Sequence, residues 1–123
     1  MTIEGKDREI IEKVKSEIKK NLLNCVDVVA PTALTTLKGY SGSFNRMFQF
    51  VITIEKNKRL VRLYIMSDYF GGRTIKDIIE KVNNNCIPLI KEENGLQFNP
   101  GDKIESMPYV LLKSDGKIET RLI

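Results

Sequence analysis

The spacing of apolar residues near the start of the chain predicts an amphipathic helix. Five apolar side chains fall within an arc of about 120° on a helix of 3.6 residues per turn. They are Ile10, Ile11, Val14, Ile18 and Leu22. The remaining face carries charged and polar residues whose charges balance, so only one side of this helix is suited to a core. We expect the helix over residues 5–24.

Two neighbouring segments alternate apolar and polar positions and predict an antiparallel β-hairpin. The segments are residues 46–54 and 59–67, joined by a turn centred on Lys56 and Asn57. This register places six apolar side chains on one buried face. They pair as Ile52 with Val61, Phe50 with Leu63 and Phe48 with Ile65. The opposite face, with Gln49, Thr53, Lys58, Arg62 and Tyr64, is expected to be exposed.

The rest of the chain supplies shorter signals. Residues 25–30 are rich in β-branched side chains and indicate a short strand, and residues 31–45 have no clean period and are interpreted as mostly loop. Thr74 and Asp77 form a near capping box that opens a second helix, which three asparagines at 83–85 and Pro88 are expected to close. Residues 87–90 indicate a strand. A final hairpin pairs Leu112 with Ile118 around Gly116.

This order of elements predicts the fold class. A helix, a short strand, a hairpin, a second helix and further strands are typical of an α+β domain. We expect a single domain over residues 1–123, with a mainly antiparallel sheet and two helices packed on one face. A chain of 123 residues is long enough to bury a core of its own.

Composition places the chain among ordinary globular proteins. Hydrophobic residues make up 41% and charged residues 29% of the sequence. No apolar run approaches the roughly 20 residues of a membrane-spanning helix, and the opening residues are charged where a signal peptide would be apolar. We therefore expect a cytoplasmic protein without a membrane partner.

The cysteines and the absence of histidine limit the chemistry. Cys25 and Cys86 stand far apart, and the chain has no histidine, so a zinc site is not expected. Two reduced thiols are the favoured interpretation over one disulfide. The sequence indicates no metal, no cofactor and no catalytic residue. No spacing joins a nucleophile to its base, although an active site formed between subunits stays open.

Positive charge is concentrated in the middle of the chain. Residues 38–73 carry seven basic and two acidic side chains, whereas the flanking segments are close to neutral. Seven of the nine aromatic residues lie in the same stretch. Cations mixed with flat rings neutralise phosphates and stack on bases, so nucleic acid is the first partner to consider.

Two groups of residues carry this hypothesis. The first is the loop before the second helix, where Gly71, Gly72, Arg73 and Thr74 are suited to hold an anion; the alternative is a plain turn and helix cap. The second is a basic hairpin suited to contact phosphates and to stack a base on an aromatic ring; the alternative is a solvated sheet face with edge-protecting cations. Its residues are Arg46, Lys58, Arg59 and Arg62, with Tyr64 or Tyr69.

The sequence thus favours a small non-catalytic nucleic-acid-associated, phosphate-binding domain. The alternative is a protein-interaction or oligomeric assembly module without nucleic-acid binding, formed in part by apolar residues on the outer hairpin face. Those residues are Met47, Val51, Leu60 and Met66.

Overall fold

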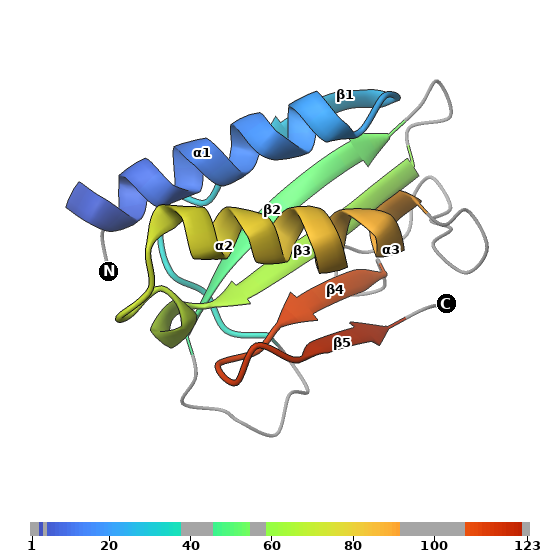
Figure 1. Cartoon of the computed structure of the whole chain (residues 1–123). Helices are drawn as coiled ribbons and strands as arrows, with labels where there is room; N and C mark the ends of the chain where they lie inside the picture. Colours follow the sequence, from blue (N-terminus) through green and yellow to red (C-terminus); the bar gives the residue numbers. More distant parts are fainter. Residues whose placement is uncertain (1–2, 4, 38–45, 55–58, 92–107, 122–123) are drawn as a thin grey trace.

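Two helical segments lie side by side on one face of a five-stranded sheet (Figure 1). The computed structural model describes residue 3 and residues 5–37, 46–54, 59–91 and 108–121. The elements are α1 (Gly5–Asn21), β1 (Cys25–Val29), β2 (Met47–Ile54), β3 (Arg59–Met66), η1 (Ser67–Tyr69), α2 (Ile75–Lys81), η2 (Val82–Cys86), α3 (Ile87–Lys91), β4 (Tyr109–Leu112) and β5 (Ile118–Arg121). The predicted α+β domain with a mainly antiparallel sheet is confirmed.

The central hairpin has the predicted register. Phe48 lies opposite Ile65, Phe50 opposite Leu63 and Ile52 opposite Val61. All six side chains are buried, and they form the floor on which the helices pack. The alternation of apolar positions decided this register, because a slip by one residue would turn the whole set away from the helices.

The first helix covers this floor with the predicted stripe. Ile10, Val14 and Ile18 have no exposed surface. The helix ends at Asn21 rather than at residue 24. The Asn21 amide donates to the backbone carbonyl of Glu17 at 2.9 Å and to Oδ1 of Asn83 at 3.2 Å, so the end of α1 is tied to η2.

The second helix does not stop where the sequence predicts. The asparagines at 83–85 form a π-helical turn, and α3 continues the helical run, so the predicted strand at residues 87–90 is wrong. The N–H of Ile87 donates to the carbonyl of Val82, five residues earlier. The π-helical turn shifts the hydrogen-bond pattern just before Pro88. The helix therefore continues although the proline has no N–H to donate.

The sheet is mixed because β4 pairs with β3 in parallel. Leu63 lies opposite Val110 and Ile65 opposite Leu112, and the helical run crosses over between these strands. Strand β5 then pairs antiparallel with β4, with Leu112 opposite Ile118 as predicted. Gly116 adopts a φ of 85°, the left-handed conformation that the turn requires.

Two further expectations concern the thiols and the membrane. Both cysteines are free, Cys86 buried and Cys25 half-buried. None of the helices within the described ranges is both long and apolar enough to span a bilayer.

Candidate functional site

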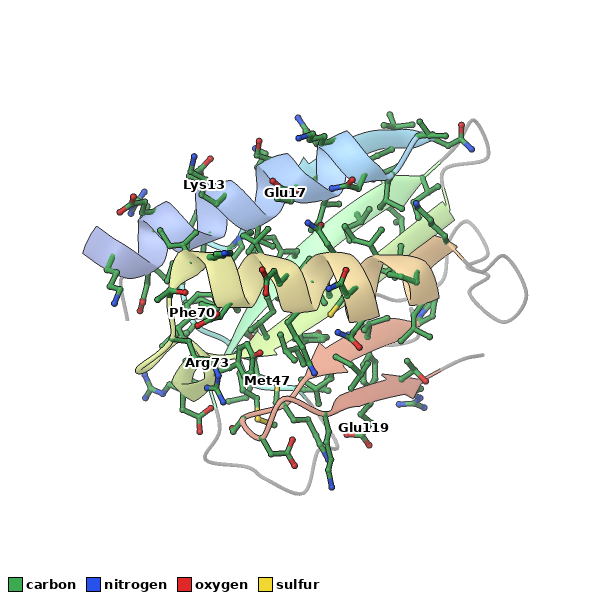
Figure 2. The ribbon with its side chains drawn as sticks, in the orientation of Figure 1. Lys13, Glu17, Met47, Phe70, Arg73 and Glu119 are labelled. Carbon is green, nitrogen blue, oxygen red and sulfur yellow. The ribbon has the colours of Figure 1, made fainter. Side chains whose placement is uncertain are left out.

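Two loops that are distant in sequence meet at the end of β3. One is the segment between β3 and α2, where Figure 2 labels Phe70 and Arg73; the other is the β4–β5 turn. Their side chains and one from α2 bring together a hydroxyl, a carboxylate and two cations. We call this group the turn site, and it consists of Asp68, Tyr69, Arg73, Lys81, Ser114 and Gly116.

The core fixes the first loop in place. The Phe70 ring stacks on Phe48 with centroids 4.5 Å apart, so the loop is anchored to the central hairpin. The N–H of Gly71 donates to the carbonyl of Asp68 at 3.2 Å. Gly72 has a φ of 73°, which residues with a Cβ rarely adopt. The two glycines therefore make the turn that the sequence predicted.

Arg73 connects the two loops. Its Nη1 donates to the carbonyl of Tyr69 at 3.0 Å, and its Nη2 donates to the carbonyl of Ser114 at 3.4 Å. The guanidinium carbon lies 4.0 Å from the centroid of the Tyr69 ring. Carbonyl bonds and ring contact together hold a positive charge in a fixed position beside the β4–β5 turn.

Ser114 and Asp68 form a hydroxyl–carboxylate pair across the same junction. Ser114 Oγ donates to Oδ1 of Asp68 at 2.5 Å. This length is typical of a bond from a hydroxyl to an ionised carboxylate. Sequence reasoning missed Ser114. The pair becomes visible only once the parallel β3–β4 register is known.

Tyr69 and Lys81 border the turn from the helix side. A Cβ built on Gly116 would lie 3.8 Å from Nζ of Lys81 and 3.8 Å from Cε2 of Tyr69. Burial raises the pKa of the Tyr69 phenol, against the opposing effect of the Arg73 charge. Tyr69 therefore stays neutral near pH 7, and its ring faces the guanidinium of Arg73.

Side chains of the same segment accept hydrogen bonds from the backbone N–H groups at the start of α2. The N–H of Asp77 donates to Thr74 Oγ1 at 3.2 Å, and the N–H of Thr74 donates to Asp77 Oδ2 at 3.4 Å. The predicted capping box is thus confirmed. Because the Asp77 carboxylate already occupies the positive helix end, the anion-binding potential of this loop rests on Arg73 rather than on Thr74.

The structure places Arg62 and Tyr64 inside the protein, whereas the sequence predicted an exposed sheet face. Only 4% of Arg62 and 2% of Tyr64 is exposed. Arg62 Nη1 donates to the Tyr64 hydroxyl at 2.8 Å, and its guanidinium carbon lies 5.4 Å from the centroid of the Tyr64 ring and 5.5 Å from that of Tyr109. Leu37, Met47, Met66 and Leu111 complete a second buried cluster on the sheet face away from the helices. The same burial removes Met47 and Met66 from the predicted outer apolar surface.

The other predicted basic residues do not gather in one place. Arg46 is exposed, and its carbonyl accepts the N–H of Ser67 at 2.8 Å, so it lies at the end of the sheet where η1 begins. Arg59 pairs with Ile54 at the opposite end of the hairpin, and its side chain, like all of Lys58, is outside the described residues. The structure brings together Tyr69, Gly71, Gly72, Arg73 and Thr74 and separates them from Arg59 and Arg62.

Comparison with known proteins gives one relation to an enzyme. No family model and no solved structure matches the chain. The chain is 31% identical over 96 residues to the phosphate acyltransferase of Pediococcus pentosaceus, a match that covers 73% of this chain and 26% of that protein. The chain therefore spans about a quarter of the length of this relative.

This likeness corrects the functional prediction from the sequence. The relation is to an enzyme, so the prediction of a small non-catalytic nucleic-acid-associated domain is wrong. The alternative, a protein-interaction or oligomeric assembly module without nucleic-acid binding, is not tested by this likeness and stays a prediction. Among the described residues of the basic stretch, Arg62 is buried, Arg73 is held at the turn site, and Arg46 lies at the other end of the hairpin from Arg59.

Proposed function

We propose that this chain takes part in acyl transfer to or from phosphate, and that the turn site binds the phosphate group. The observation that carries the proposal is the 31% identity to a phosphate acyltransferase over 96 residues. An acyl phosphate and inorganic phosphate are both compact anions, so either needs a positioned cation. Arg73 is such a cation.

The arrangement around Arg73 supports this role. A guanidinium has five N–H donors. In the described contacts, each terminal nitrogen of Arg73 donates one hydrogen bond to a backbone carbonyl, and the guanidinium lies against the Tyr69 ring. A guanidinium held in this way loses little side-chain entropy when it binds an oxyanion in a bidentate manner. Lys81 adds a second positive charge at the border of the same site.

A binding experiment tests the phosphate site. Inorganic phosphate is titrated into the ¹⁵N-labelled chain, and amide shifts are followed by NMR. We expect saturable shifts at residues 71–74 and at Ser114 and Gly116. Arg73→Gln should weaken binding about tenfold or more, since a charge-assisted hydrogen bond contributes roughly 1.5–3 kcal/mol. The matched control is Arg121→Gln, an exposed arginine on β5, which should leave binding unchanged.

An activity assay tests the reaction. The chain is incubated with an acyl thioester and inorganic phosphate, and acyl phosphate is detected as the hydroxamate formed with hydroxylamine. Product that depends on both substrates and falls in Arg73→Gln supports the proposal. Absence of product together with absence of phosphate binding refutes it.

A further inference from the structure

We propose that Ser114 is the nucleophile that carries the acyl group, with Asp68 as its base and Arg73 beside the phosphate. This inference rests on the proposed function and adds a covalent intermediate to it. Three groups of different chemistry meet here from two loops: the Ser114 hydroxyl, the Asp68 carboxylate and the Arg73 guanidinium. A nucleophile bonded to its base next to a fixed cation is the arrangement that acyl transfer requires.

The proton of Ser114 points to Asp68. The serine oxygen lies 2.5 Å from Asp68 Oδ1 and 3.1 Å from the sulfur of Met66. A carboxylate is a much stronger acceptor than a thioether, so the single hydroxyl proton lies toward Asp68. The bond draws electron density onto the serine oxygen and gives its proton a place to go.

The turn does not need this bond to keep its shape. The N–H of Gly116 donates to the carbonyl of Lys113, and the N–H of Lys113 donates to the carbonyl of Lys117, both at 2.9 Å. Asp115 Oδ1 accepts the N–H of Lys117 at 2.9 Å. These bonds and the left-handed Gly116 close the turn independently of the serine hydroxyl. Ser114 is only half-buried, and its bond to Asp68 lies at an exposed place on the protein.

The covalent step balances without another reactant. Ser114 Oγ attacks the carbonyl carbon of an acyl phosphate while Asp68 takes the hydroxyl proton. The carbon–oxygen bond to phosphate breaks, and the phosphate leaves with the bonding electron pair, beside Arg73, and receives the proton from Asp68. The products are an acyl ester on Ser114 and inorganic phosphate. The same steps in reverse form an acyl phosphate from the acyl-serine and phosphate.

Isotope exchange tests the intermediate. The chain is incubated with acetyl phosphate and ³²P-labelled inorganic phosphate without any other acyl acceptor. A reversible acyl-serine moves the label into acetyl phosphate, and intact-mass spectrometry detects one added acetyl group that peptide mapping assigns to Ser114. Ser114→Ala should abolish both signals. Asp68→Asn keeps a hydrogen-bond partner but not the base, and should slow exchange about 100-fold or more.

The controls separate this inference from the proposed function. Asp115→Asn removes a carboxylate from the same turn and should exchange like the parent chain, which excludes a general effect of charge at the turn. Circular dichroism verifies that each variant is folded. If the chain makes acyl phosphate from the thioester but neither exchanges label nor acquires acetyl at Ser114, transfer is direct and the inference is refuted while the proposed function stands. If phosphate neither binds nor reacts, both are refuted.

Discussion

Replacing Tyr64 with Phe removes one oxygen atom from the second buried cluster and tests whether that cluster stabilises the fold. The Tyr64 hydroxyl accepts a hydrogen bond from Arg62 at 2.8 Å and donates one to Gln49 Oε1 at 2.9 Å. The ring keeps its size, so almost no cavity forms. The change therefore isolates two polar interactions in a place from which water is largely excluded.

The magnitude follows from the type of each bond. A hydrogen bond from a charged donor contributes roughly 1.5–3 kcal/mol and a neutral one roughly 0.5–1.5 kcal/mol, and removal of the buried hydroxyl recovers part of its desolvation cost. We expect Tyr64→Phe to lower the free energy of unfolding by about 2 kcal/mol. With a slope near 2 kcal/mol per molar, the urea midpoint then falls by about 1 M.

Urea unfolding followed by circular dichroism measures this loss. Gln49→Leu should cost less than Tyr64→Phe, because it removes only the neutral bond, and the double variant should cost less than the sum of the two. A loss below about 0.5 kcal/mol for Tyr64→Phe, or strict additivity in the double variant, would refute the reasoning.

Two further predictions concern the helix cap and alkaline pH. Thr74→Ala removes the side-chain half of the capping box and should cost about 1 kcal/mol in urea unfolding, whereas Thr74→Ser should keep most of the stability; equal losses would contradict the role of the cap. Burial raises the pKa of Cys86 to about 12 from an ordinary value of 9.0, and also raises the pKa of Tyr64 and Tyr69. The folded state therefore holds these protons more tightly than the unfolded state does. Their contribution to the free energy of unfolding is complete at neutral pH and is lost as the pH rises above about 9. Unfolding curves measured from pH 7 to 11 should show this decline, with a smaller slope in Cys86→Ala; a flat profile would contradict it.

Several local elements could be predicted from the sequence because the spacing of their residues fits only one type of secondary structure. The alternation through Phe48, Phe50 and Ile52 determined the register of the hairpin, and Thr74 with Asp77 determined the start of α2. The end of that helix could not be predicted in the same way. Pro88 usually ends a helix, and only the π-helical turn before it lets the helical run continue.

The site was harder to predict because it depends on pairing between distant segments. Gly71, Gly72 and Arg73 carried a local signal, whereas Ser114 gained its meaning only from the parallel pairing of β3 with β4. Arg62 misled the prediction for a related reason. Alternation showed which face it lies on, but nothing local showed that this face is also covered, or that two tyrosines contact the guanidinium.

The parallel pairing of β3 with β4 also bears on the order of folding. The β2–β3 and β4–β5 hairpins join neighbouring segments and close short loops, whereas pairing Leu63 with Val110 closes a long one at a greater entropic cost. We therefore expect the two halves of the sheet to join last. Asp68 belongs to one half and Ser114 to the other, so a nascent or partly folded chain holds the two groups apart. The chain would thus acquire its reactive pair only on completing its fold.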